Sequence, residues 1–170
     1  ILSRVVTMKI RPLSEETVAE YLMGTGLSTE ESHTLAAYSQ GRIGQALELM
    51  EDDAFREMRQ DILGKLEALP SMHEGEAYLM AKELEAYKSD LRFLDIMELW
   101  YRDLLMAKSL REERYLIQKD KKEAIFRGAN EPAEKLAKKA EAVRKARIRL
   151  SQNANFRLTM EVMLMDLKEN

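Results

Sequence analysis

Apolar side chains recur at intervals of three and four residues along most of the chain, which is the spacing of one face of an α-helix. In the first third of the chain this spacing predicts three short helices, since Ser14 and Ser28 are favourable N-caps and glycine-containing segments separate the apolar runs. Glu31 follows Ser28 at capping-box spacing. Ahead of these helices, apolar residues between positions 5 and 10 predict a short extended segment that ends at Pro12.

The pattern changes after the acidic triplet at residues 51–53, which we interpret as a domain boundary. Longer apolar stripes follow, and they predict a bundle of longer helices. The charged segment 111–122 interrupts them and is expected to be irregular, with one short turn before Gly128. The predicted longer helices cover residues 55–66, 78–87, 91–105, 133–154 and 156–167. The expected fold class is therefore all-α, with a small three-helix subdomain in residues 1–50 and a helical bundle in residues 51–170.

Composition supports this fold and excludes several kinds of chemistry. The chain has 170 residues, is 45% hydrophobic and 34% charged, and contains only 7 glycines and 3 prolines, a mixture that favours helices. It has no cysteine, which excludes disulfides and thiolate sites and suits a reducing cytoplasm. No apolar run is long enough to span a bilayer, so no membrane association is expected. Because the chain begins on Ile1, we expect it to be a fragment of a longer protein.

Charge is distributed unevenly along the chain. Residues 1–110 carry 12 basic and 20 acidic side chains, whereas residues 111–150 carry 13 basic and 7 acidic ones. An acidic front half is a poor surface for nucleic acid. The basic stretch is expected to be a solvated helix face or to contact an acidic partner, with direct DNA contact as the less favoured alternative.

Candidate catalytic and binding residues are few. The two histidines, His33 and His73, lack partners at metal-ligand spacing and are expected at the surface, so no metal site is predicted. No phosphate-binding G-x-x-x-x-G-K-[ST] loop is present, and no cofactor is expected. The methionines, together with Trp100 and Tyr101, are expected to form core or interface contacts.

Two features stand out against this background. Ser3 and Arg4 precede the apolar segment, and an arginine in that place is either a surface charge or a group that reaches a phosphate on a neighbouring subunit. The segment from Gly41 to Leu47 opens the third helix with two glycines.

Together, these features resemble the AAA+ clamp-loader family. In that family a Ser-Arg-Cys motif supplies an arginine that acts in trans on ATP bound by the adjacent subunit; Ser3 and Arg4 match it, and Val5 replaces the cysteine. The third helix of the lid domain opens with a Gly-Ser-Met-Arg-x-Ala-Leu-like pattern whose arginine senses the γ-phosphate. Here Gly44 stands at the arginine position, and a glycine cannot supply a charge.

With this departure, the chain resembles the non-motor delta-prime subunit of bacterial DNA polymerase III. Residues 153–158 are similar to the Asn-x-Asn segment that closes the last collar helix of delta-prime proteins. The resemblance implies a three-helix AAA+ lid followed by a helical collar that oligomerises. Implied catalytic residues are Arg4, as an arginine finger in trans, and Ser3 of the same motif; Gly44 implies that no nucleotide is bound here.

The implied function is assembly of the pentameric ring that loads the sliding clamp on DNA. Partners would be motor and delta-type subunits, bound through residues 53–170, with ATP only on the neighbouring subunit and DNA contacted indirectly. The chain would not be an enzyme by itself, but a cytoplasmic part of the polymerase holoenzyme. Three alternatives stay open: a gamma or tau motor fragment, a free-standing helical interaction module, and a DNA-binding domain that uses residues 111–150.

Overall fold

The structure, a computed structural model, describes residues 11–169. These residues form α-helices joined by loops and short 3₁₀ turns, and no strand occurs among them, so the predicted all-α class is confirmed. The extended segment expected at residues 5–10 lies outside the described residues. The chain divides after Asp52 into two compact units, which are treated separately below.

The first unit contains three short helices: α1 (Glu15–Gly24), α2 (Thr29–Ser39) and α3 (Ile43–Glu51). Both predicted N-caps are confirmed. The Ser14 hydroxyl accepts the Thr17 N–H at 3.2 Å, and the Ser28 hydroxyl accepts the Glu31 N–H at 3.3 Å. Ser28 also donates to the Glu31 carboxylate at 2.8 Å, so the pair stabilises the start of α2.

Small and apolar residues from all three helices pack together in this unit. The fully buried positions are Val18, Ala19, Leu22, Ala36 and Ala46. Alanines at these contacts let short helices approach closely, which suits a core built from few large side chains.

Gly41 connects the turn between α2 and α3 to the segment that precedes α1. It lies in the turn between α2 and α3 with φ +79°, a left-handed conformation that favours glycine. Its carbonyl accepts the Leu13 N–H at 2.9 Å, so the turn is tied to the segment before α1. A Cβ atom at this position would lie 2.8 Å from Pro12 Cβ and would also collide with the Leu13 carbonyl oxygen.

The second unit contains the longer helices. Its α-helices are α4 (Asp53–Ala68), α5 (Glu74–Glu83), α6 (Arg92–Leu110), α7 (Lys122–Gly128), α8 (Ala133–Ser151) and α9 (Phe156–Glu169). The 3₁₀ turns η2 (Leu69–Ser71) and η3 (Leu84–Tyr87) follow α4 and α5. Two further turns, η4 (Glu113–Tyr115) and η5 (Lys119–Lys121), lie in the segment predicted to be irregular.

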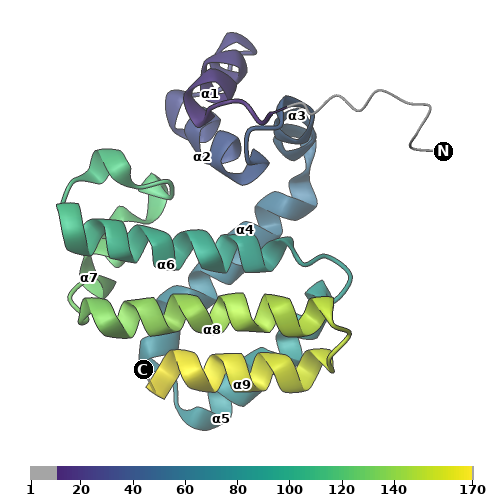
Figure 1. The fold of residues 1–170 in the computed structure, drawn as a ribbon, viewed down its shortest axis with the longest axis vertical. Helices are drawn as coiled ribbons and strands as arrows, with labels where there is room; N and C mark the ends of the chain where they lie inside the picture. Colours follow the sequence, from purple (N-terminus) through teal and green to yellow (C-terminus); the bar gives the residue numbers. More distant parts are fainter. Residues whose placement is uncertain (1–10, 170) are drawn as a thin grey trace, which may run out of the picture. The chain divides into compact units, whose positions relative to one another are not determined.

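Helices α6, α8 and α9 form one layer of the second unit (Figure 1). Helix α8 lies between the other two and packs against both, while α4 crosses behind α6 and α5 packs against α9. Each helix in the layer runs opposite to its neighbour. For α8 and α9 this is expected, because only residues 152–155 connect them.

Aromatic rings join three elements at one end of this bundle. The Phe93 ring of α6 is 6.2 Å from the Tyr87 ring of η3 and 6.0 Å from the Phe156 ring of α9, measured between centroids. Both distances lie in the range of favourable ring pairs. Trp100 and Tyr101 of α6 are buried, as expected.

Some predicted details of the helices are wrong. Tyr78 and Leu79 helped to predict α5, yet both are exposed, and the buried face of α5 carries Ala77, Met80 and Ala81. The most apolar helix begins at Arg92, slightly later than predicted. The Asp90 carboxylate accepts the N–H of this first residue at 3.1 Å.

Replacing Gly41 with Ala should destabilise the first unit by about 1–2 kcal/mol or more, because a Cβ atom disfavours the left-handed conformation and collides with the preceding segment. Gly44→Ala is the matched control: an added Cβ meets no atom within 4 Å, and alanine favours a helix by up to about 1 kcal/mol. Hydrogen exchange of the amides in α1–α3 should therefore accelerate in the first variant and not in the second. Equal protection in both would show that Gly41 is not required.

Candidate subunit interface

The two residues predicted to act on a neighbour's ATP, Ser3 and Arg4, lie outside the described residues, so their role stays a prediction. Gly44 is described: it is the second residue of α3, is exposed, and has open space around its Cα. The nearby Arg42 guanidinium donates instead to the Ser39 carbonyl and to Gln40 Oε1, each at 3.3 Å. Position 44 is therefore exposed and has space for a Cβ atom, but it carries no side chain.

The asparagine segment before the last helix forms the turn between α8 and α9. Asn153 adopts φ +61°, and the N–H groups of Asn153 and Ala154 donate to the Leu150 and Arg149 carbonyls at 3.0 Å each. This is the Schellman arrangement that ends a helix, and it explains why α8 stops at Ser151 rather than near the predicted Ala154.

Asn155 then begins the next helix. Its Oδ1 accepts the Leu158 N–H at 2.9 Å, while its carbonyl accepts the Thr159 hydroxyl at 2.7 Å. One asparagine thus ends α8 and the other caps α9. With one residue between them, the two asparagines form the tight turn that makes α8 and α9 antiparallel. This turn is the structural role of the Asn-x-Asn segment.

Helix α9 presents apolar residues on two sides. One side packs into the bundle, whereas Leu158 and Met165 on the other are 60% and 56% exposed. On the adjacent α5, Tyr78 and Leu79 are 50% and 56% exposed. We refer to these four residues as the α5–α9 face. Tyr78 and Met165 border the same depression between the two helices. Exposed apolar residues on two packed helices are typical of a protein–protein contact.

Tyr78 is held in place on this face by α9. The Arg157 guanidinium lies 5.1 Å from the centre of the Tyr78 ring and donates a hydrogen bond to its hydroxyl. Arg157 is oriented in turn by Glu161, which accepts from its Nε at 3.0 Å. A tyrosine fixed in this way loses little side-chain entropy when a partner covers it.

The face is also hollowed beside Tyr78. A depression of about 250 Å³ lies between α5 and α9, and Met165 and Leu164 form part of its wall. Glu161 and Lys168 border it. An apolar centre with charged residues around it is the usual arrangement of a protein interface.

Several cations of the basic stretch 111–150 are paired with acidic neighbours. Arg147 contacts Asp95 at 2.7 Å and Glu98 at 2.8 Å, both on α6. Burial lowers the pKa of Arg147, but its bonds to these carboxylates more than offset this and raise that pKa above its ordinary value. The other ion pairs made by this stretch are Arg114–Glu112, Lys121–Glu67, Lys122–Glu113, Lys138–Glu134, Lys139–Glu131 and Arg144–Glu141.

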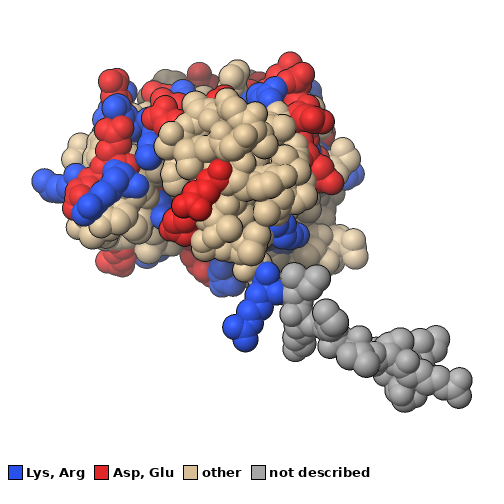
Figure 2. Space-filling model, turned by 90° about the horizontal axis from the view of Figure 1, so that it is seen from above, with Lys and Arg blue, Asp and Glu red and all other residues tan. Residues whose placement is uncertain are grey.

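Acidic and basic side chains are interspersed on the face drawn in Figure 2. Separately from this view, several cations of residues 111–150 are held against carboxylates in ion pairs. A nucleic-acid surface instead needs cations that remain available to phosphates. The paired charges therefore weaken the DNA-binding alternative.

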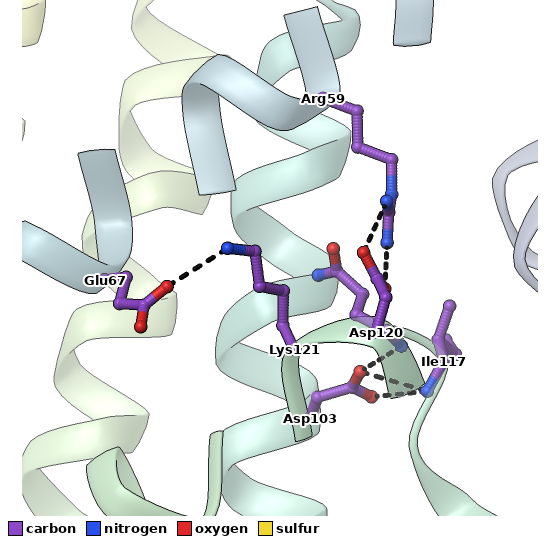
Figure 3. A network of polar contacts seen from close by, with 7 residues as sticks. Arg59, Glu67, Asp103, Ile117, Asp120 and Lys121 are labelled. Atoms are coloured by element: carbon purple, nitrogen blue, oxygen red, sulfur yellow. Dashed lines mark hydrogen bonds and ion pairs between the residues drawn. The ribbon is translucent and has the colours of Figure 1, made fainter. Parts of the chain in front are cut away.

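A buried carboxylate anchors the segment that leaves α6 (Figure 3). Asp103 Oδ2 accepts the backbone N–H groups of Ile117 at 3.0 Å and Gln118 at 2.8 Å, and Oδ1 accepts from Arg102 at 2.7 Å. Burial raises the pKa of Asp103, and these donors counteract that rise by stabilising the carboxylate. The sequence analysis missed this residue, although an aspartate among the apolar residues of α6 was a signal.

Two ion pairs join the same segment to α4. Arg59 donates to both carboxylate oxygens of Asp120, at 2.7 and 3.0 Å, and Lys121 contacts Glu67 at 3.1 Å (Figure 3). Burial raises the pKa of Asp120, but the Arg59 guanidinium more than offsets this effect and lowers that pKa below its ordinary value. The segment is thus fixed to both α6 and α4, and it positions α7, which follows directly.

Residues 54–169 match the family model described as the C-terminal part of the DNA polymerase III delta subunit. The chain belongs to this family. The match covers nearly all of the second unit and none of the described residues of the first. It confirms the resemblance to clamp-loader proteins at the family level. No curated protein and no solved structure gives a significant match.

For this delta-subunit family domain, the structure shows neither a metal cluster nor a membrane helix in the part of the chain that it describes. Within residues 11–169, no three potential ligands among histidine and acidic residues gather at metal-binding distances. No helix among these residues is long and apolar enough to span a bilayer. The best-defined candidate site is the α5–α9 face, where Arg157 fixes Tyr78 beside an apolar depression.

Proposed function

We propose that this chain supplies the lid and collar of a delta-prime-type, non-motor subunit of the DNA polymerase III clamp loader. The observation that supports the clamp-loader part of this proposal is the membership of residues 54–169 in a family described as the C-terminal part of the delta subunit. In this function residues 1–50 complete the nucleotide-binding domain and form the lid, and residues 51–170 form the collar. The subunit would work in the cytoplasm as a non-catalytic part of the holoenzyme, in a pentameric ring that loads the sliding clamp on DNA.

The assignment to delta-prime rests on the first unit. Gly44 stands where motor subunits of the family carry a sensor arginine, and this exposed position in α3 has no side chain to supply a charge. Ser3 and Arg4 match the motif whose arginine acts on a neighbour's ATP. This combination favours a subunit that binds no nucleotide here and assists hydrolysis by an adjacent motor subunit.

The collar would contact its neighbours through helix faces that the bundle leaves exposed. Contacts around a ring of different subunits are head-to-tail, so each collar needs two separate surfaces. The α5–α9 face suits one of them because Tyr78 is already fixed by Arg157, and Met165 and Leu158 are apolar and exposed. Motor and delta-type subunits are the proposed partners.

Replacing Arg4 with Ala in the full-length subunit should leave ring assembly intact and lower ATP hydrolysis by the reconstituted clamp loader. An arginine that stabilises the transferring phosphoryl group in trans contributes on the order of 10³–10⁵ in rate in related systems. The matched control is Arg11→Ala, since Arg11 is exposed and lies close by in the sequence. Hydrolysis at the wild-type rate in the Arg4 variant would exclude the arginine finger.

Replacing Met165 with Glu should weaken assembly with motor subunits by about 2 kcal/mol or more, because a charge would be buried at the centre of the contact. Ile148→Glu on α8 is the control, since Ile148 is also apolar and 40% exposed but lies outside the α5–α9 face. The mass of the mixed complex can be measured by light scattering. Normal assembly of the Met165 variant would show that the α5–α9 face is not part of the contact. If the wild-type chain itself joined no motor subunit, a free-standing interaction module would be favoured.

A further inference from the structure

The second unit contains a cavity that is separate from the α5–α9 face. It has a volume of about 350 Å³ and opens between α4, α6, α7 and the start of α8. Leucines from several elements form part of its wall. These are Leu66, Leu69, Leu104, Leu136 and Leu167. A cavity of this size lies within the range of small ligand sites, and its wall suits an apolar group.

Trp100 and Tyr101 also line the cavity, and each is only 4% exposed. Their rings lie beside the leucines and Ala124, so this part of the wall is apolar. It suits a bulky apolar side chain.

The mouth of the cavity carries charged residues, some of them already paired. Lys139 contacts Glu131 at 2.6 Å, and Glu67 contacts Lys121 at 3.1 Å. These two carboxylates are therefore compensated by cations within the same unit.

Two further cations near the mouth have no acidic partner among the described residues. Arg127 of α7 lines the cavity and is exposed. Lys108 of α6 donates only to the backbone carbonyl of Asn130, at 3.3 Å, and Asn130 also lines the cavity. Uncompensated positive charge beside an apolar cavity complements a ligand that is both acidic and apolar.

We propose that this cavity binds an acidic segment of a partner protein, by enclosing one bulky apolar side chain of that segment. The apolar side chain would enter the leucine-lined cavity, and carboxylates next to it would contact Arg127 and Lys108. A buried apolar anchor with charged residues around it is the usual arrangement at the centre of a peptide contact. This inference does not depend on ring assembly or on the identity of the clamp-loader subunit.

The chain contains a built-in reporter for this binding. Trp100 is its only tryptophan and lines the cavity, so a group that enters should change the indole fluorescence. The probe is a short aspartate-rich peptide with one phenylalanine and no tryptophan or tyrosine. We expect a saturable change in Trp100 emission, and binding about ten-fold weaker when the phenylalanine is replaced by serine or the aspartates by lysine.

Arg127→Glu should weaken binding of the same peptide by about ten-fold or more. Arg149→Glu is the matched control, because Arg149 is exposed on α8 and does not line the cavity. Circular dichroism checks that both variants keep their helices.

Three results would overturn the proposal. The first is no saturable change up to about 1 mM peptide. The second is equal binding of the phenylalanine and serine peptides, which tests the cavity without altering the protein. The third is saturable binding of a single-stranded oligonucleotide in place of the acidic peptide.

Discussion

The arrangement of the second unit depends on how α9 is oriented in the helix layer. Five apolar residues of α9 are buried in the bundle; these are Phe156, Met160, Met163, Leu164 and Leu167. The turn made by Asn153 and Asn155 fixes this orientation. Leu158 and Met165 are consequently left in solvent, and a helix that is apolar on two sides needs a second partner.

Polar contacts position the part of the unit that lies away from this face. The Asp103 carboxylate accepts two backbone N–H groups from the segment that follows α6, and Arg59 and Glu67 hold the same segment against α4. Helix α7 begins directly after these contacts. The position of Arg127 on α7, beside the cavity, therefore depends on the buried Asp103 of α6.

Much of the helical fold could be predicted from the sequence because its signals are local. Ser14 and Ser28 begin helices through bonds to residues three positions away, and the stripe of α4 is buried as its spacing indicates. Tyr78 could not be placed from spacing alone. Whether an aromatic residue faces the core or solvent depends on which side of α5 packs against α9, and that is a long-range property.

The candidate site was less predictable for the same reason. The Asn-x-Asn segment was noticed as a resemblance, but its role as a turn appears only in the paired backbone hydrogen bonds. Asp103 and Arg127 gain significance only from residues far away in the sequence. The match to a delta-subunit family confirms the general resemblance, while the roles of Ser3 and Arg4 stay predictions.

The most direct test of the proposed collar contact is hydrogen exchange in the free chain and in the reconstituted clamp loader. The amides of α5 and α9 should exchange more slowly in the complex, because a partner that covers the α5–α9 face suppresses local opening of these helices. The exposed side of α8 serves as an internal reference. Unchanged exchange in α5 and α9, in a complex that is shown to be assembled, would contradict the account.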